Sequence, residues 1–304
     1  MSQRVPVVAV VGPTAAGKSD LAVDLALRLD GEVVNADSMQ LYRGMDIGTA
    51  KLTVAERRGV RHHLLDLYDV TRPATVAEFQ RLARDAVDDC RARGVTPILV
   101  GGSALYVRAV LDRFEFPGTD PEVRARLEEE LAEAGAAELH RRLAGRDPAA
   151  AAAILPTNGR RVVRALEVIE LTGRPFTATL PPREYHYDDV VQIGLDVPRD
   201  VLDERIERRV ARMWEQGLVG EVRELERRGL RDGPTASRAL GYAQVLAYLA
   251  GDLGEDAGRA ETVQLTRRFA RRQQAWFGKD DRIGRVPFDA DDRLERALTY
   301  HRRS

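Results

Sequence analysis

One stretch near the N-terminus constrains this chain more than any other. Residues 12–19 read Gly12-Pro13-Thr14-Ala15-Ala16-Gly17-Lys18-Ser19, which matches the G-x-x-x-x-G-K-[ST] pattern of a phosphate-binding P-loop. The apolar segment 5–11 before it is typical of a buried parallel strand, and residues 20–29 after it carry apolar side chains at helical spacing. A strand, a glycine-rich turn and a helix in this order predict an α/β fold: a P-loop NTPase-like parallel sheet flanked by helices.

The chemistry of this loop follows from its backbone and two side chains. The N–H groups of the loop and of the helix after it would point at a phosphate. Lys18 adds a compact positive charge, and Ser19 offers a hydroxyl to Mg²⁺. We therefore expect a phosphate compound and Mg²⁺ at residues 12–19. The pattern does not say which phosphate compound binds or what happens to it.

The composition is that of a globular protein. The 304 residues are 44% hydrophobic and 31% charged, and no apolar run is long enough for a transmembrane helix. The first strand follows the N-terminus at once, so we expect no signal peptide. Cys90 is the only cysteine, which excludes an internal disulfide and a cysteine-cluster zinc site. We expect a cytoplasmic enzyme that acts as a monomer and has no membrane partner.

Charge is distributed unevenly along the chain. The formal net charge of −1 gives no support for nucleic-acid binding. Residues 259–285, however, contain eight basic and three acidic side chains, a local excess of +5. Within this segment Arg267, Arg268, Arg271 and Arg272 would form one stripe on a helix.

Polar residues follow the ends of the next predicted strands. Segment 32–36 reads as a strand and leads into Asp37-Ser38-Met39-Gln40. Ligands of parallel α/β sheets bind beyond the carboxyl ends of strands, so Asp37 should lie near the P-loop. As an alternative, Asp37 could serve only as a turn former or helix cap. Strand 96–100 leads into Gly101-Gly102-Ser103, which brings a hydroxyl to the same edge, and no Walker B carboxylate ends that strand.

Other segments show clear local patterns. The capping box at Thr75 predicts a helix to about residue 93, and segment 190–197 predicts a strand that returns to the sheet. Segment 61–67 could be another strand, in which the adjacent His62 and His63 would face opposite sides and make a poor metal pair. Further helices are expected around the arginine-rich residues 205–212, after residue 241 and over 260–277, with an ordinary surface terminus from residue 287.

Residues 114–187 differ from their surroundings. Within them, residues 121–173 are rich in Ala, Glu and Arg, break at Gly135, at 147–148 and at 158–159, and contain no strand-like segment. We predict an inserted all-helical lobe at 114–187 within an α/β core formed by residues 1–113 and 188–304. Arg160, Arg161 and Arg164 lie at the start of its last helix, as part of either a solvated face or a binding surface.

Four motifs together resemble one family. The order and spacing of residues 12–19, 37–40, 44–51 and 101–106 closely resemble the tRNA dimethylallyltransferases, also called tRNA isopentenyltransferases. The resemblance continues through residues 160–166 and 217–222 and ends near 267–276. One motif departs from the family, in which Gly-Gly-Thr-Gly-Leu-Tyr is usual. Here Ser103 keeps the hydroxyl and Ala104 replaces a glycine, so a positive φ at this position is in question.

The resemblance implies a specific reaction. Such enzymes transfer a dimethylallyl group from dimethylallyl diphosphate to N6 of the adenosine beside the anticodon, at position 37 of tRNAs that read codons beginning with U. The products are N6-dimethylallyladenosine and diphosphate, and Mg²⁺ assists. In this chain the resemblance assigns the donor's diphosphate to Gly12, Pro13, Thr14, Ala15, Ala16, Gly17, Lys18 and Ser19, with Mg²⁺ on Ser19.

The same resemblance assigns roles to residues beyond the P-loop. Asp37 would accept the N6 proton, Ser103 would support the leaving group or the adenine, and Arg209 would stabilise the leaving diphosphate, with Arg205 nearby in sequence. The tRNA anticodon stem-loop would contact a larger set, in which Ser38 to Gln40 line a pocket for the flipped base. This set is Asp37, Ser38, Met39, Gln40, Ser103, Arg124, Arg160, Arg161 and Arg164.

Two other functions compete with this interpretation. A P-loop small-molecule kinase explains residues 12–19 and the α/β core, but gives no role to residues 37–40, the inserted lobe or the basic stripe. A non-catalytic RNA-binding or nucleotide-sensing module explains the arginines, but gives Asp37 and Ser103 no task. Transfer of label from dimethylallyl diphosphate to tRNA, or from ATP to a small acceptor, would separate the three.

Overall fold

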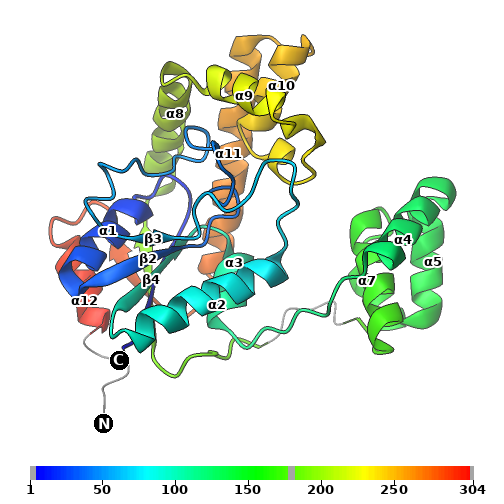
Figure 1. Cartoon of the computed structure of the whole chain (residues 1–304), viewed down its shortest axis with the longest axis horizontal. Helices are drawn as coiled ribbons and strands as arrows, with labels where there is room; N and C mark the ends of the chain where they lie inside the picture. Colours follow the sequence, from blue (N-terminus) through cyan, green and yellow to red (C-terminus); the bar gives the residue numbers. More distant parts are fainter. Residues whose placement is uncertain (1–4, 177–181, 302–304) are drawn as a thin grey trace. The chain divides into compact units, whose positions relative to one another are not determined.

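A computed structural model describes residues 5–176 and 182–301. It divides them into two compact units: residues up to Asp112 together with those from Tyr185 onward, and Arg113–Glu184. The first unit contains the sheet, and the second contains the green helices of Figure 1. The boundaries drawn from the sequence, 114 and 187, lie beside this division, while the tRNA-binding role of the helical part stays a prediction. No helix in the described ranges combines the length and apolar character that crossing a membrane requires.

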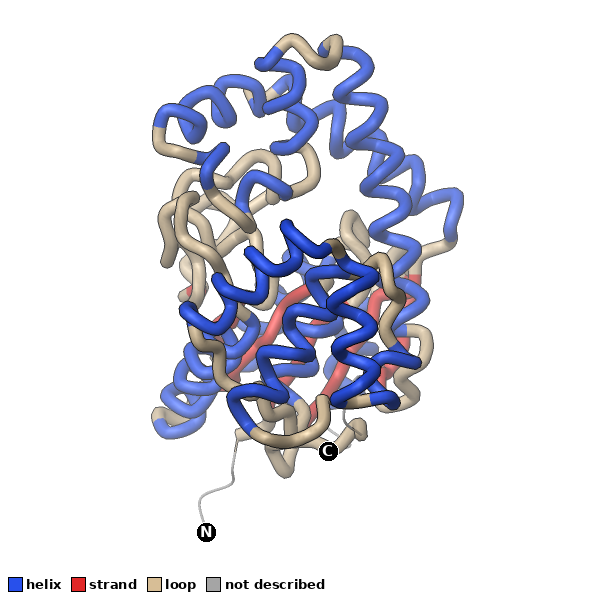
Figure 2. Tube along the Cα trace, turned by 90° about the vertical axis from the view of Figure 1, so that its right-hand side faces the viewer, coloured by secondary structure: helices blue, strands red, loops and turns tan. Residues whose placement is uncertain are grey.

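The larger unit is built on a six-stranded sheet in the order β3-β2-β4-β1-β5-β6, in which every pairing is parallel. Helices cover both faces of the strands, which are drawn in red in Figure 2. The predicted α/β fold with a parallel sheet is confirmed. The strands are β1 (Val7–Val11), β2 (Gly31–Asn35), β3 (His62–His63), β4 (Thr96–Gly101), β5 (Val190–Asp196) and β6 (Ile283–Pro287).

The parallel arrangement explains where the predicted site residues lie. The P-loop follows β1, Asp37 follows β2 and Ser103 follows β4, and these three strands are neighbours in the sheet. The register aligns their ends, because Val11 pairs with Gly101 and Asn35 pairs with Val100. All three segments therefore leave the same edge of the sheet, where ligands of such folds bind.

The sheet separates two hydrophobic clusters. The five side chains of β1 are wholly buried and alternate between them: Val7, Ala9 and Val11 face one cluster, while Val8 and Val10 face the other. Burying each valine stabilises the fold by about 1.5–3 kcal/mol relative to leaving it exposed. This all-apolar strand is why segment 5–11 could be recognised in the sequence.

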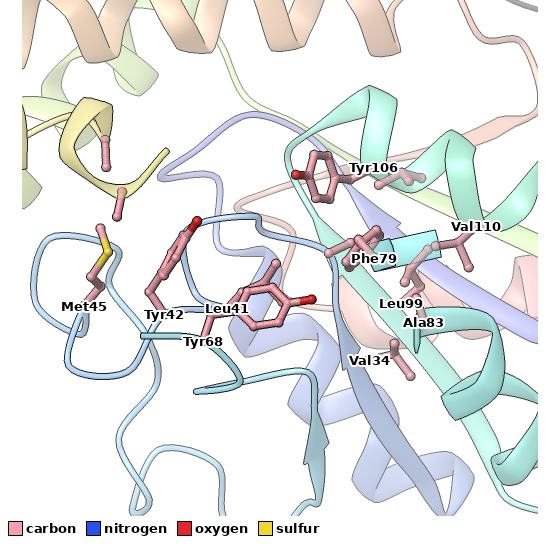
Figure 3. Packing of buried hydrophobic residues seen from close by; sticks show 14 of the residues in the cluster. Val34, Leu41, Tyr42, Met45, Tyr68, Phe79, Ala83, Leu99, Tyr106 and Val110 are labelled. Carbon is pink, nitrogen blue, oxygen red and sulfur yellow. The ribbon is translucent and has the colours of Figure 1, made fainter. Parts of the chain in front are cut away.

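Figure 3 shows the first of these clusters at close range. Side chains from β2 and β4 pack there against Phe79 of α2 (Val76–Ala92) and Tyr106 of α3 (Ala104–Leu111), whose ring centroids are 4.7 Å apart. Tyr42 and Met45, which belong to the segment after β2, are fully buried in the same cluster. The loop that leads away from Asp37 is thereby fixed to the core.

The remaining helices of this unit are α1 (Lys18–Leu29), α8 (Arg199–Glu215), α9 (Leu218–Arg227), α10 (Tyr242–Ala250), α11 (Glu255–Phe277) and α12 (Arg293–His301), with short 3₁₀ turns at Leu230–Asp232 and Ala236–Arg238. The expected start of α2 is confirmed, since the Thr75 hydroxyl accepts a hydrogen bond from the Glu78 N–H at 3.2 Å. Gly94, with φ of +73°, follows the C-cap of this helix.

Two local expectations were wrong. Segment 61–67 forms a strand only at residues 62–63, because Leu64 and Asp66 have φ of +61° and +57° and turn the chain away. The segment from Pro287 is no plain surface terminus: β6 extends the sheet, and α12 buries Ala297 and Leu298.

The helical unit has its own core. It contains α4 (Pro121–Ala134), α5 (Ala136–Arg146), α6 (Pro148–Ala153) and α7 (Gly159–Thr172), which surround fully buried Leu127, Leu143 and Leu166. The segments that lead into and out of this unit run side by side. The His186 N–H donates to the Leu111 carbonyl at 2.7 Å, and the Arg113 N–H donates to the Glu184 carbonyl at 2.8 Å.

Candidate active site

The P-loop has a strained backbone that only certain residues adopt readily. Gly12 and Gly17 have φ of +138° and +95°, and Ala15 takes the left-handed region with φ of +62°. Gly17 is also the N-cap of α1, so the loop leads directly into the helix N-terminus. The Lys18 ammonium folds back over the loop and donates to the Pro13 carbonyl at 2.7 Å. This arrangement directs positive charge and helix N–H groups toward one place.

The environment of Lys18 disfavours its charged form when no anion is bound. Burial, with help from the Arg209 charge, lowers the pKa of Lys18 to about 7, although the Asp37 carboxylate acts in the opposite direction. A half-buried ammonium with cationic neighbours loses much of its solvation. A bound phosphate group would restore the favourable environment of the charged form.

A cavity of about 610 Å³ opens beside the loop. Its walls come from the P-loop with the start of α1, from the loop between residues 46 and 56, and from α8. Four arginines line it from α8: Arg205, Arg208, Arg209 and Arg212. Their spacing places them on one face of the helix. Apolar atoms of Ile47, Ala50, Leu52 and Met213 also line the cavity, which therefore has both charged and apolar walls.

Two of these arginines are tied to the cavity walls. Arg205 donates to the Ala15 carbonyl of the P-loop at 2.7 Å, and Arg209 donates to the Thr49 carbonyl at 3.3 Å. Burial lowers the pKa of Arg209; Asp37 opposes this effect, and Arg212 and Arg205 add to it. The fold thus holds several positive charges close together. A bound anion would form charge-assisted hydrogen bonds with these arginines and offset their mutual repulsion.

Asp37 lies within electrostatic reach of both Lys18 and Arg209. Buried Asn35 holds the turn, because its side-chain oxygen accepts from the Asp37 N–H at 2.9 Å and its amide donates to the Asp37 carbonyl at 3.0 Å. One carboxylate oxygen of Asp37 accepts from the Met39 N–H at 2.9 Å. Asp37 therefore is a turn former, as the alternative interpretation held, and it also faces the charged groups of the site.

The predicted base-pocket residues after Asp37 differ in their contacts. Ser38 forms a hydrogen bond with Tyr106, Met39 packs against the core, and the Gln40 amide donates to the Thr49 carbonyl at 3.2 Å. In the loop that follows, Lys51 is buried and binds Asp46 and Asp66 at 2.6 Å each. Lys51 is thus an internal cross-link of the cavity wall.

Gln273 of α11 is a site residue that sequence reasoning did not single out. It is 6% exposed; its oxygen accepts from the Thr14 N–H at 2.8 Å, and its amide donates to the Gly102 carbonyl at 2.7 Å. A Cβ at Gly102 would lie 2.3 Å from this amide, so a side chain there would displace Gln273 from these bonds. One side chain thereby joins the P-loop to the turn that carries Ser103. The only signal in the sequence was a glutamine pair beside the basic stripe.

Ser103 occupies the N-cap of α3 without using its side chain as a cap. The residue is half-buried at the sheet edge. Ala104 begins the helix and is not among the residues with positive φ. The departure from the family's Gly-Gly-Thr-Gly motif is thus accommodated by ordinary helical backbone.

The predicted RNA-contacting arginines of the helical unit fall into two pairs. Arg160 and Arg161 are exposed. Arg124 and Arg164 both bind Glu167, which is wholly buried, and Arg164 also donates to the Pro117 carbonyl at 2.6 Å. Burial by itself would raise the pKa of Glu167, but the hydrogen bonds from both arginines outweigh it and lower the pKa. Arg124 and Arg164 thus have a structural task, and their contact with RNA stays a prediction.

Across the described ranges, one group of side chains could hold a metal ion through His, Cys or carboxylate atoms: Glu32, His63 and Cys90. Arg93 already binds Glu32 through two nitrogens, at 2.8 and 2.7 Å. Burial raises the pKa of Cys90 to about 12, so the thiol does not supply the thiolate that a metal requires. The group also lies toward the start of β2, away from the strand ends where Asp37 lies. We therefore read it as an internal ion pair.

Comparison with known proteins places this geometry in context. A profile of the family described as IPP transferase matches residues 40–280. The tRNA dimethylallyltransferase of Thermobifida fusca (strain YX) is 66% identical over 297 residues, which cover 96% of this chain and 93% of that protein. The protein of the same name from Streptomyces avermitilis is 70% identical over 277 residues, covering 91% and 88% of the two chains.

Solved structures agree with the sequence comparison. The tRNA isopentenylpyrophosphate transferase of Bacillus halodurans has a TM-score of 0.68 and 40% identity, with 98% of this chain and 99% of that chain covered. A eukaryotic dimethylallyltransferase described as acting on tRNA has a TM-score of 0.79 and 25% identity, with 98% and 77% covered.

Proposed function

Because this chain belongs to the IPP transferase family of tRNA dimethylallyltransferases, we propose that its cavity beside the P-loop binds dimethylallyl diphosphate. The protein is a tRNA prenyltransferase, and the kinase and the non-catalytic module are set aside. The finer points are part of the proposal: transfer goes to N6 of the adenosine beside the anticodon in tRNAs that read U-initial codons, and a cytoplasmic monomer performs it.

The observation that carries the proposal is the mixed lining of the cavity. Lys18, Arg205, Arg209 and Arg212 supply four cationic groups, whereas Ile47 and Met213 supply apolar surface. Dimethylallyl diphosphate has the matching division, with two phosphate groups at one end and a five-carbon hydrocarbon at the other. The site thus offers a partner to each half of the donor.

The residues around the diphosphate would assist its departure. Breaking the allylic C–O bond adds negative charge to the leaving diphosphate. Lys18, the loop N–H groups and the Arg209 guanidinium surround the place where that charge develops, so they stabilise the transition state more than the bound donor. The fixed backbone of the P-loop means that these donors need little rearrangement during the reaction.

The cavity also contains an oxygen ligand suited to Mg²⁺. Ser19 lines it and offers its hydroxyl, whereas the carboxylates of Asp46 and Glu56 are engaged by Lys51 and Thr53. Hydroxyl and carboxylate oxygens are the ligands that Mg²⁺ prefers, with phosphate oxygens completing its shell. We assign the ion to Ser19 and the donor's diphosphate, where it would neutralise part of the charge on the leaving group.

The acceptor side would be formed by Asp37, Ser103 and residues 38–40. The N6 amine of adenine must lose a proton as it attacks the allylic carbon, and the Asp37 carboxylate faces the cations of the donor site. Ser103 lies across from it on the neighbouring turn. The exposed Arg160 and Arg161 of the helical unit, together with Arg124 and Arg164, are proposed to contact the anticodon stem-loop.

The test is transfer of label. The protein is incubated with radiolabelled dimethylallyl diphosphate, Mg²⁺ and an unmodified tRNA whose position 37 is adenosine, with the same tRNA carrying guanosine there as the matched control. Label should reach only the adenosine tRNA, and nucleoside analysis should find N6-dimethylallyladenosine. A parallel incubation with labelled ATP and small acceptors should give no transfer. Label on the guanosine tRNA, or phosphate transfer from ATP, would contradict the proposal.

A further inference from the structure

Glu221 of α9 makes a set of contacts that the proposed chemistry has not used. Its carboxylate accepts hydrogen bonds from three successive backbone N–H groups: those of Asp46 at 3.2 Å, Ile47 at 2.7 Å and Gly48 at 3.3 Å. The Tyr242 hydroxyl donates to the same carboxylate at 2.5 Å. Successive N–H groups that converge in this way form a binding site for an anion. Here the anion is a side chain of the protein itself.

The segment that Glu221 holds is a wall of the cavity. Asp46, Ile47 and Ala50 line the cavity, and Gly48 packs against Tyr242 so closely that a Cβ there would lie 2.4 Å from the ring. One residue further on, the Thr49 carbonyl accepts from Arg209 at 3.3 Å and from Gln40 at 3.2 Å. The same short backbone therefore touches Glu221 on one side and the donor-site arginine on the other.

The wall does not need Glu221 for its own shape. The Lys51 N–H donates to the Asp46 carbonyl at 2.9 Å, and the Ala50 N–H donates to the Ile47 carbonyl at 3.0 Å. The Thr49 hydroxyl donates to the Met45 carbonyl at 2.6 Å. These bonds close the turn internally. The bonds to Glu221 instead tie the turn to α9, and so set its position relative to the arginines of α8.

We propose that Glu221 is a positioning residue for the prenyl-donor site. It holds the wall at residues 46–48 so that the Thr49 carbonyl orients the Arg209 guanidinium toward the diphosphate. Without Glu221, three N–H groups lose their acceptor, the wall shifts away from α8, and Arg209 is no longer aimed at the donor. This inference rests on the proposed binding of dimethylallyl diphosphate in the cavity.

The experiment compares Glu221→Ala with Glu224→Ala. Glu224 lies on the same helix but is exposed and pairs with Arg227, so it controls for loss of a charge on α9. The dissociation constants of dimethylallyl diphosphate and of tRNA are measured separately by calorimetry. Glu221→Ala should raise the donor constant by about ten- to a hundredfold, as expected for orphaned N–H donors, and leave the tRNA constant unchanged. Glu224→Ala should change neither.

Chemical rescue separates positioning from a general loss of stability. Formate or acetate can occupy the place of the missing carboxylate in Glu221→Ala and accept from the same N–H groups. Either should restore donor affinity at least in part, whereas chloride at equal ionic strength should not. If donor affinity is unchanged in Glu221→Ala, or if it is lowered but no carboxylate restores it, the proposal is overturned.

Two further measurements cover the other outcomes. If Glu221→Ala does not fold, Tyr242→Phe keeps the ring against Gly48 and removes one donor from Glu221, and it should raise the donor constant by about two- to fivefold. An unchanged constant in that variant would overturn the proposal. If the wild-type protein binds neither dimethylallyl diphosphate nor inorganic diphosphate, the proposed function fails. Amide hydrogen exchange of residues 46–48 in Glu221→Ala still decides whether the clamp itself exists.

Discussion

The lowered pKa of Lys18 predicts that the protein takes up protons when it binds the prenyl donor. In the free protein burial lowers this pKa to about 7, so at pH 8 only about a tenth of the molecules carry a charged Lys18. The donor's diphosphate favours the charged form and raises the pKa of Lys18 in the complex. Binding at pH 8 should therefore take up about 0.9 proton per donor, against about 0.1 at pH 6.

The same linkage fixes how affinity depends on pH. Between the free and bound pKa values, the complex binds more protons than the free protein does. A rise in pH therefore weakens binding, by up to about tenfold, or 1.36 kcal/mol, for each unit above 7. Below pH 7 Lys18 is already charged in the free protein, so affinity should become independent of this group.

Calorimetry measures the proton uptake directly. Donor binding is titrated at pH 6, 7 and 8 in buffers whose ionisation enthalpies differ, so that the slope of the observed heat against buffer enthalpy counts protons. Lys18→Arg is the matched control, because a guanidinium stays charged throughout this range. It should remove the uptake assigned to Lys18 and leave only the protons of the donor itself. Equal uptake at pH 8 in wild type and Lys18→Arg would refute the reasoning.

Three other predictions address single features. Asp37→Asn keeps the shape of the turn and loses basicity, so single-turnover transfer should slow by about 10²- to 10⁴-fold while both substrates still bind; a rate near wild type would send the search for the base elsewhere. Glu32 has its pKa lowered from 4.5 to about 2, chiefly by the Arg93 hydrogen bonds; because Arg93 is partly exposed and solvent screens the pair, Glu32→Gln should cost about 1–3 kcal/mol at neutral pH. Chemical denaturation should show that difference shrinking as pH falls from about 5 toward 2. Replacing Arg160 and Arg161 by alanine should reduce the salt dependence of tRNA binding by about one phosphate contact each, and an unchanged slope would move the RNA surface to the stripe on α11.

Much of the fold could be predicted because short segments of the sequence determine where several strands and helices begin. The all-apolar segment before the P-loop and the capping box at Thr75 each act within a few residues. The edge strand β6 was not predicted, because its sequence, Ile-Gly-Arg-Val-Pro, contains no apolar run. It is held by pairing with β5, which no local pattern reveals.

The candidate site shows the same limit more sharply. Residues 12–19, Asp37 and Ser103 could be found because each directly follows a strand. Gln273 and Glu221 could not, because their partners in the P-loop and in the cavity wall lie 259 and about 175 residues away along the chain. The roles of these two side chains can be recognised only from the contacts that form when α11 and α9 pack against the rest of the fold.

The adjacent ends of the helical unit bear on how such a protein could change over time. His186 bonds back to Leu111, and Asp112 bridges Tyr185 in antiparallel fashion, so the main chain leaves the sheet-bearing unit and returns at nearly one point. Residues 113–184 therefore form an insertion that can vary independently of the sheet. Because closing a longer loop costs only slightly more entropy, helices could be added, trimmed or exchanged there without rerouting a single strand. If the helical unit contacts RNA as we propose, its contact surface could change in this way while the cavity beside the P-loop stays the same.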